Sequence, residues 1–241
     1  MRRDGRAPDQ LRPIRIRRRF TRTPAGSVLI SAGRTTVLCT VSVVEGVPGW
    51  LQASGRGWLT AEYGMLPGST APRRSRDRGR VDGRTVEIQR LIGRSLRAVV
   101  RLEQLGEYTL WVDCDVLEAD GGTRTVSITG AFVALVDALK RFLPAGTHPV
   151  DVLRDSVAAV SVGLVDGTCL LDLDYEEDSQ AAVDFNVVLT GTGKFVELQG
   201  TGESTPFQQK ELQEMVRLAR RGIAQLTDAQ RKALAKDWPF G

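Results

Sequence analysis

A glycine-rich turn followed by threonine and arginine is the clearest candidate for chemistry in this sequence. The run Asp120-Gly121-Gly122-Thr123-Arg124-Thr125 stands between an expected strand and an expected helix. Glycines let main-chain amides approach a ligand, and a helix start adds unsatisfied N–H donors with a partial positive charge. With the Thr123 hydroxyl and the Arg124 guanidinium, this set matches one phosphate group. It also fits a plain glycine turn in which Thr123 caps a helix.

Arginines earlier in the chain extend the same chemistry. Arg84 is expected at a helix start, where the helix dipole makes a cation mildly unfavourable; an ordinary surface role is the alternative. Residues 67–83 are expected to form a loop, and it holds Arg73, Arg74, Arg76, Arg78 and Arg80. Five like charges repel unless an anion gathers them, and flexible arginine-rich segments bind phosphate backbones. We therefore favour nucleic acid over a merely solvated loop.

Carboxylates gather in the second half of the chain, in the run from Asp172 to Asp178 and at Asp184. Asp178 is expected to end one strand and Asp184 to open the next, so the two converge if those strands pair across the turn at 179–180. Such oxygen ligands suit Mg²⁺ or Mn²⁺, which keeps its waters and contacts substrate phosphate. The alternative is a solvated hairpin end, and this is the interpretation we give to Asp172 and Asp174.

Composition narrows the possible functions. The single histidine among 241 residues, His148, means that a Ser-His-Asp triad or a histidine metal site would depend on that one residue. Residues 1–101 hold 21 Arg and no Lys against 7 acidic residues, a net charge of +14, and the rest of the chain carries −10. This asymmetry fits either a polyanionic partner or mutual attraction between the halves, within one fold or across subunits.

The chain is expected to be cytoplasmic. Its three cysteines are far apart in apolar runs, which is typical of reduced thiols rather than of a disulfide framework. We expect no membrane-spanning helix and no export signal.

Strands that alternate with helices around tight turns predict one α+β domain with mixed sheets over residues 1–241. The expected strands are 13–20, 27–32, 36–44, 58–65, 108–117, 156–165, 169–175, 181–189 and 194–200. The expected helices are 85–102, 123–143, 208–225 and 228–236, and the second is apolar nearly all round, so it should be buried. The first carries an arginine stripe opposite its apolar face, which indicates a solvated face, with a subunit interface or an RNA track as alternatives: Arg90, Arg94, Arg97 and Arg101.

Together these parts indicate chemistry on a phosphodiester. Hydrolysis would normally need a base or a metal-bound hydroxide, whereas inorganic phosphate is already an anion at neutral pH. Arg84 and Arg124 would offset the repulsion between two anions, and a metal ion would stabilise the leaving 3′ oxygen. The residues therefore favour phosphorolysis.

Long stretches of the chain resemble the ribonuclease PH family of phosphate-dependent 3′→5′ exoribonucleases, which trim tRNA precursors. The stretches run nearly from end to end: DGR at 4–6, LRP at 11–13, GWLTAEYGMLP at 57–67, GRTVEIQRLIGRSLRA at 83–98, DCDVLEADGGTRTVSITGA at 113–131, YEEDSQAAVDFNV at 175–187 and ELQGTGE at 197–203. The resemblance implies a βαβ-type, ribosomal-protein-type fold in a homohexameric ring, a trimer of dimers. It implies action on the 3′ ends of tRNA precursors and other RNA, with inorganic phosphate as co-substrate and Mg²⁺, or Mn²⁺, as the metal.

The resemblance also implies residue roles. Phosphate would lie on Arg84, Gly122, Thr123 and Arg124, and Asp178 and Asp184 would be the catalytic, metal-associated pair. Arg73 and Arg76 look like the loop arginines that hold tRNA. Where the family often has a further arginine this chain has Gly68, and Arg74 is the candidate replacement. A non-catalytic RNA-binding ring subunit of an exosome-like complex is one alternative function, and a hydrolytic ribonuclease is another.

Overall fold

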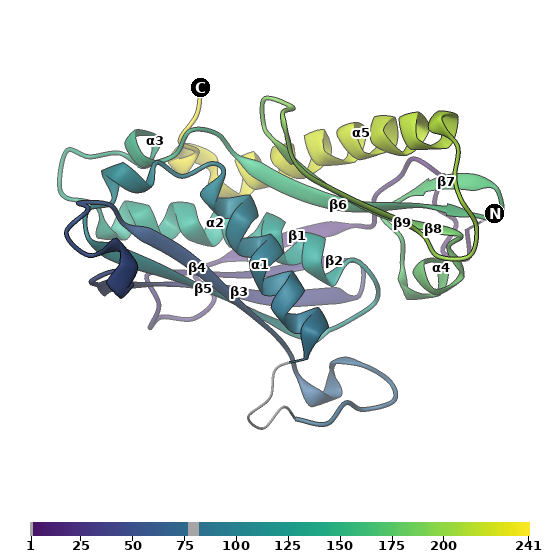
Figure 1. Ribbon diagram of the computed structural model, residues 1–241, viewed down its shortest axis with the longest axis horizontal. Coiled ribbons are helices and arrows are strands. Elements are labelled where there is room, and N and C mark those ends of the chain that lie inside the picture. Colours follow the sequence, from purple (N-terminus) through teal and green to yellow (C-terminus); the bar gives the residue numbers. More distant parts are fainter. Residues whose placement is uncertain (1, 77–81) are drawn as a thin grey trace.

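Two β-sheets that meet along a buried helix form the framework of the computed structural model, which describes residues 2–76 and 82–241 (Figure 1). The first sheet has the strand order β1-β2-β3-β5-β4, and the second has the order β7-β6-β8-β9. The strands are β1 (Ile14–Arg18), β2 (Gly26–Ala32), β3 (Thr35–Glu45), β4 (Trp58–Met65), β5 (Tyr108–Glu118), β6 (Val157–Val165), β7 (Thr168–Leu171), β8 (Val183–Thr190) and β9 (Phe195–Gly202). The helices are α1 (Gly83–Arg97), α2 (Thr123–Phe142), α3 (Pro149–Val152), α4 (Tyr175–Gln180) and α5 (Gln209–Leu234).

The first sheet is mixed, and the expected α+β fold is confirmed. Its strands β1, β2, β3 and β5 pair antiparallel, whereas β4 pairs parallel with β5 after the chain passes through α1, which makes a βαβ unit. Alternation explains these strands: in β3, Val37, Cys39 and Val41 are fully buried, and the residues between them are only partly covered. The buried side chains form one core with α1 and α2.

The first helix is shorter than predicted. It begins where the Asp82 carboxylate accepts a hydrogen bond of 2.6 Å from the backbone N–H of Thr85. It ends at Arg97 rather than near residue 102, because Val100 pairs with Leu153 in an isolated bridge. The β-branched side chain of Val100 favours this extended pairing.

Helix α2 lies at the centre of the molecule, and its predicted burial is confirmed. Every residue from Thr125 to Leu139 is buried. The hydroxyls of Ser127 and Thr129 donate to carbonyls four residues earlier, so these polar groups are satisfied inside the helix. The helix contacts both sheets, through β2, β3 and β6. Its N-terminus therefore opens at the junction between the sheets.

The second sheet is antiparallel throughout, and two predictions about its surroundings are wrong. Strand β7 ends at Leu171 rather than at residue 175, because Asp174 caps α4 by accepting a hydrogen bond from the backbone N–H of Glu177. The C-terminal region forms one helix, α5, instead of two. Buried Gln230 donates to the carbonyls of Thr129 and Val157, and this keeps the helix continuous across the expected break.

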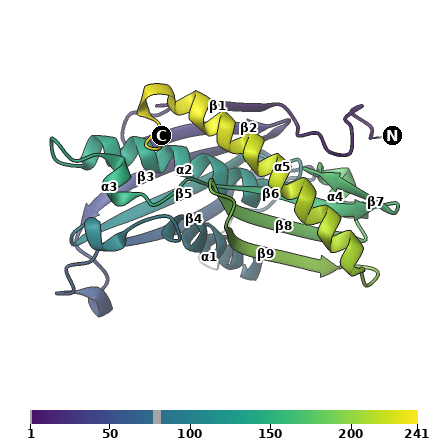
Figure 2. The same ribbon diagram turned by 90° about the horizontal axis from the view of Figure 1, so that it is seen from above.

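The layers are clear in two views. Helix α5 lies over the second sheet, and α1 lies on the far side of the molecule from it (Figure 2). The segment before α1, up to residue 76, projects from the body (Figure 1). None of the helices described is long and apolar enough to cross a membrane.

Candidate active site

A cavity of about 450 Å³ lies between the two sheets, and it gathers most of the residues that the sequence singles out. The lining contains the candidate residues Arg74, Arg84, Gly122, Thr123, Arg124, Asp178 and Asp184. It also contains Met65, Thr70, Ala71, Pro72, Ala119, Gly121, Ser161, Tyr175 and Asn186. His148 lies on the surface at the start of α3, and it does not line the cavity.

The start of α2 forms one wall of the cavity. Gly122 occupies the N-cap position with φ +66°, and it has no side chain with which to cap the helix. The Thr123 hydroxyl is hydrogen-bonded to the buried Tyr63 hydroxyl at 2.8 Å, which holds it in place. Backbone N–H groups at a helix start, with the positive end of the helix dipole, attract an anion. This wall can hold a phosphate group.

Two guanidinium groups, those of Arg84 and Arg124, complete this wall, which we call the cationic wall. Arg124 follows Thr123 in α2, and its side chain is 14% exposed. The distances from its Nη1 to Gln199 Oε1 and Glu87 Oε1 are 3.4 and 3.5 Å. These contacts are longer than a strong charge-assisted hydrogen bond, so the guanidinium can still bind an oxyanion. Arg84 is the second residue of α1, and it is exposed where it lines the cavity.

Asp178 and Asp184 also line the cavity, and we call this pair the carboxylate wall. Burial and the neighbouring Asp184 charge raise the pKa of Asp178 from 3.8 to about 6, although Arg84 and Arg124 oppose the rise. Burial likewise raises the pKa of Asp184 above its ordinary value, again against the two arginines. These mutual effects show that two carboxylates and two guanidinium groups share one electrostatic environment. A cation that binds here would stabilise the two buried carboxylates in their charged form. Shifted pKa values of this kind are typical of functional sites.

The carboxylate pair converges by a different route from the one predicted. Asp184 is the second residue of β8, as expected. Asp178 lies in α4 rather than at a strand end, and so the two do not meet across a hairpin. A single helical turn, which begins at the Asp174 cap, carries Asp178 over the start of β8. The capping pattern of Asp174 and Glu177 was the signal in the sequence for this turn.

The donor set fits a small, hard cation. Within residues 2–76 and 82–241, no group of three or more histidine, cysteine, aspartate or glutamate side chains could hold a metal ion. Two carboxylates suit Mg²⁺, which retains several waters and takes further ligands from substrate phosphates. The residues present therefore fit Mg²⁺ or Mn²⁺ bound jointly by Asp178, Asp184 and substrate.

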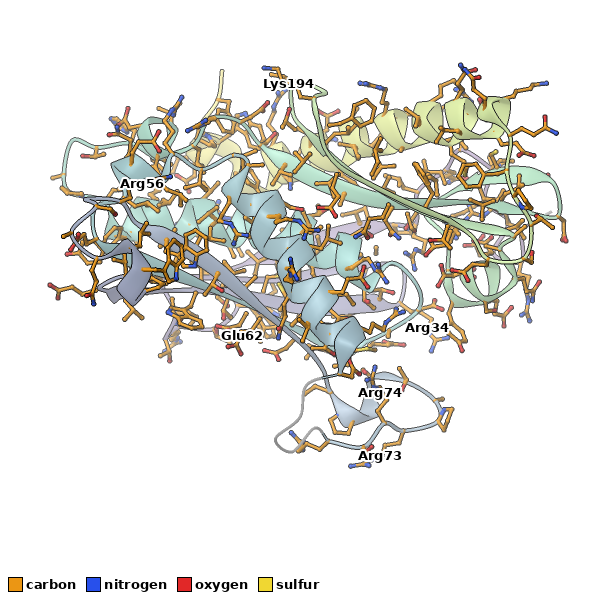
Figure 3. The ribbon with its side chains drawn as sticks, in the orientation of Figure 1. Arg34, Arg56, Glu62, Arg73, Arg74 and Lys194 are labelled. Carbon is orange, nitrogen blue, oxygen red and sulfur yellow. The ribbon has the colours of Figure 1, made fainter. Side chains whose placement is uncertain are left out.

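The predicted RNA-binding loop lies beside the cavity. Figure 3 shows Arg73 and Arg74 on the projecting segment, with Arg74 on the side that faces the body. Arg74 lines the cavity and pairs with Asp82 at 3.4 Å, whereas Arg73 and Arg76 are exposed. Arg78 and Arg80 lie outside the described residues. Gly68 is exposed, and a Cβ atom built there meets open space.

The solvated interpretation of Asp172 and Asp174 is wrong. Asp172 is 4% exposed and accepts a bidentate contact from the guanidinium of Arg12, with its shorter arm 2.7 Å long. Asp174 caps α4. Sequence reasoning missed the pairing of Asp172 with Arg12 because the two lie 160 residues apart in the chain, and it passed over the local capping pattern of Asp174 with Glu177. It also missed Tyr175, which is 62% exposed at the cavity.

The arginine stripe on α1 is more than a solvated face. Arg94 pairs with Glu197 of β9 at 2.5 Å, and Arg97 stacks on the ring of Trp58. Arg101 lies beyond the helix end and donates to the carbonyls of Val150 and Leu153. Arg90 is exposed. Arg94 and Arg97 thus connect α1 to its neighbours, and Arg101 connects the segment after the helix to residues 150–153.

Comparison with known proteins agrees with this arrangement. The family model described as "3′ exoribonuclease family, domain 1" matches residues 10–140, and the one described as domain 2 matches residues 155–222. The first match contains β1 to β5 with α1 and most of α2. The second contains β6 to β9 with α4 and the first half of α5.

Curated relatives are similar over almost their whole length. Ribonuclease PH of Corynebacterium efficiens is 59% identical over 233 residues, which are 96% of this chain and 95% of the relative. Ribonuclease PH of Corynebacterium kroppenstedtii is 56% identical over 241 residues, 99% of this chain and 95% of the relative.

Solved structures share the fold at low identity. Rrp46 of rice (Oryza sativa) has a TM-score of 0.79 at 20% identity, covering 97% of this chain and 100% of that one. The Archaeoglobus fulgidus exosome with RNA bound to the active site gives 0.80 at 23% identity, covering 94% and 91%. Together with the family models and the curated relatives, these matches establish that the chain belongs to the ribonuclease PH family of 3′ exoribonucleases.

Proposed function

We propose that this protein is a phosphate-dependent 3′→5′ exoribonuclease. In the forward reaction, inorganic phosphate attacks the terminal phosphodiester of an RNA, which loses one nucleotide as a nucleoside diphosphate. The reverse reaction adds a nucleotide and releases phosphate. The observation that carries the proposal is one cavity in which Arg84, Arg124 and the start of α2 face the carboxylates of Asp178 and Asp184.

Phosphate binding is the task of the cationic wall. The amides at Gly122 to Arg124 and the Thr123 hydroxyl donate to phosphate oxygens, and Tyr63 fixes that hydroxyl. Arg124 and Arg84 supply the positive charge that lets two anions approach each other. The attacking group is already an anion at neutral pH, so this wall needs no general base. The absence of histidine from the cavity lining is consistent with this chemistry.

The carboxylate wall is responsible for the leaving group. Asp178 and Asp184 are the residues that would hold Mg²⁺ or Mn²⁺, which when bound would stabilise negative charge on the departing 3′ oxygen. Burial makes the ionised pair costly without a cation, so a partner cation neutralises both carboxylates at once. Arg84 and Arg124 oppose the rise in the pKa of both carboxylates and so favour their ionised forms.

For substrates and assembly, we propose tRNA precursors, with other RNA 3′ ends including ribosomal RNA, and a homohexameric ring built as a trimer of dimers. Arg73, Arg74 and Arg76 beside the cavity would hold the RNA backbone. The net charge of +14 on residues 1–101 and −10 on the remainder supports contacts between basic and acidic parts of neighbouring subunits. We propose the cytoplasm as the place of action, in keeping with the three free cysteines.

A single assay tests the proposed reaction. A tRNA with a short 3′ extension is incubated with the protein and Mg²⁺, with and without inorganic phosphate, and the products are resolved. Phosphorolysis predicts that trimming stops without phosphate and that each released nucleotide is a diphosphate. Phosphate-independent release of monophosphates would show a hydrolytic ribonuclease, and RNA binding without any trimming would show a non-catalytic ring subunit.

Arg124→Ala sharpens this test. Loss of the guanidinium should reduce phosphate-dependent release of nucleoside diphosphate at least 100-fold, because a single charge-stabilising donor is commonly worth that much. The affinity for tRNA, measured without phosphate, should not change, since the loop arginines remain. Arg217→Lys on the exposed side of α5 is the control, and unaltered turnover in Arg124→Ala would contradict the assignment.

A further inference from the structure

Three arginines in the first twelve residues are buried, although a chain terminus is usually exposed. Arg2, Arg6 and Arg12 are only 8%, 7% and 4% exposed. The N-terminal strap, residues 2–12, runs beside β7 and α4 (Figure 1), and the Leu171 amide donates to the Pro8 carbonyl at 2.8 Å. Buried ion pairs are weak stabilisers, since apolar residues of similar size do as well or better. Three buried arginines therefore call for a role in geometry.

Arg12 connects two parts of the active site. On one side its Nε and Nη2 atoms donate to the Asp172 carboxylate at 3.1 and 2.7 Å, and its backbone N–H donates to the same group at 2.8 Å. On the other side the guanidinium donates to the carbonyls of Asp120 and Gly121. These two residues belong to the phosphate loop, residues 120–122, which leads into the proposed phosphate-binding amides. The Thr35 hydroxyl donates to the same Gly121 carbonyl at 2.7 Å. One planar side chain thus spans from the segment before α4 to the phosphate loop.

The phosphate loop and α4 are in direct contact at this point. A Cβ atom on Gly121 would lie 2.5 Å from the Leu173 carbonyl oxygen and 2.9 Å from the Tyr175 nitrogen. A Cβ on Gly122 would lie 3.1 Å from Nη2 of Arg12. The loop therefore packs between the guanidinium and the start of α4, with no space for a side chain. A small displacement of Arg12 must move the loop, the helix or both.

Arg2 connects the N-terminal strap to α4. Its guanidinium forks onto the Glu177 carboxylate at 2.7 and 2.6 Å, and it donates to the carbonyls of Leu171 and Asp172 at 2.9 Å each. Glu177 in turn accepts from the Asp174 amide and closes the cap of α4. Glu177 is the residue before Asp178. The strap thus reaches the backbone that carries the metal-associated carboxylate.

We infer that Arg12, with the N-terminal strap, is a positioning residue that sets the distance between the phosphate site and the carboxylate pair. This inference rests on the proposed phosphorolysis. Arg12 does not line the cavity, and it acts through Asp172, Gly121 and α4. Phosphate must lie within reach of both the RNA linkage and the carboxylate wall, and misplacement by about 1 Å is enough to cost about 100-fold in rate.

Arg12→Lys tests the inference while it keeps the charge. A lysine ammonium cannot bond the Asp172 carboxylate and the loop carbonyls in one plane. We expect the KM for inorganic phosphate and the half-saturating Mg²⁺ concentration to rise about tenfold each, as for the loss of one charge-assisted hydrogen bond. The affinity for tRNA without phosphate should stay that of the parent. Arg217→Lys controls for the substitution type and should leave all three unchanged, because the Arg217 guanidinium pairs with Glu214 at the surface.

The outcomes separate positioning from general stability. Unchanged KM for phosphate in folded, assembled Arg12→Lys would overturn the inference, and so would a parallel fall in tRNA affinity that tracks the folded fraction. If Arg12→Lys does not fold, Glu177→Gln is the second variant: it should raise the half-saturating Mg²⁺ concentration severalfold with little effect on the KM for phosphate. No change in the Mg²⁺ requirement would overturn the inference. A parent protein that trims RNA without phosphate would instead refute the proposed function and this inference with it.

Discussion

Replacing Asp178 by asparagine is expected to stabilise the metal-free protein while it abolishes phosphorolysis. Burial and the Asp184 charge raise the pKa of Asp178 from 3.8 to about 6. A carboxyl whose pKa is higher in the folded state binds its proton more tightly there than in the unfolded chain. The free energy of unfolding therefore falls as the pH rises from about 4 to about 6, and the full penalty applies above pH 6.

The magnitude follows from the size of the shift. About two pKa units at 1.36 kcal/mol each set an upper bound of about 3 kcal/mol at pH 7.5. The cavity is open to water, so screening reduces this, and we expect Asp178→Asn to gain about 1 to 2 kcal/mol. At pH 5 most of the parent's Asp178 is protonated, and the gain should shrink to about half.

Urea unfolding in EDTA at pH 7.5 and pH 5, at one fixed protein concentration, measures this gain. Asp228→Asn is the matched control, because Asp228 is exposed on α5 and its replacement should change the stability little at either pH. Mg²⁺ should stabilise the parent and not Asp178→Asn. An Asp178→Asn protein that is less stable than the parent at pH 7.5, or whose gain does not depend on pH, would refute the electrostatic reasoning.

Three further substitutions test other parts of the site. Gly121→Ala should lower kcat/KM for phosphate about 100-fold, because its Cβ meets the Leu173 carbonyl. Gly146→Ala has a similar positive φ but open space, so it isolates that clash from backbone strain. Asp184→Asn should lose activity but keep its assembly by gel filtration, and an unchanged rate with an unchanged half-saturating Mg²⁺ concentration would argue against a metal-associated role. Gly68→Arg should bind tRNA severalfold more tightly with a steeper salt dependence in filter binding, and Gly49→Arg, also on an open 3-10 turn, should not.

Local signals predicted the strands well, and they place the residues of the expected anion site next to one another in the chain. Alternating β-branched residues mark β2 and β3, and the apolar run of α2 predicted its burial, which is continuous over residues 125–139. The Gly-Gly-Thr-Arg run predicted an anion site at the start of α2, because its donors come from consecutive residues. Such features depend on neighbours in the chain, which the sequence displays directly.

Features that depend on distant partners escaped prediction. The acidic run from Asp172 to Asp178 looks like one solvated hairpin end, yet its members do three different things: Asp172 binds Arg12, Asp174 caps α4, and Asp178 faces the cavity. The local capping pattern with Glu177 marks Asp174, but nothing local distinguishes Asp172 from Asp178. Only the fold brings Arg2, Arg6 and Arg12 against the acidic run, and burial then makes these arginines depend on their ion pairs.

Distant partners also account for the proposed role of the N-terminal strap in holding the carboxylate pair. An isolated six-residue helix such as α4 is too short to be stable in water by itself. Its position must come from its cap and from contacts outside it, and Arg2, Arg12 and Gly121 supply those contacts. Asp178 lies on this helix, and its raised pKa means that burial disfavours its charged form. On the proposed mechanism, the N-terminal segment would hold Asp178 over the expected phosphate site, although burial disfavours its charged form, until a cation binds.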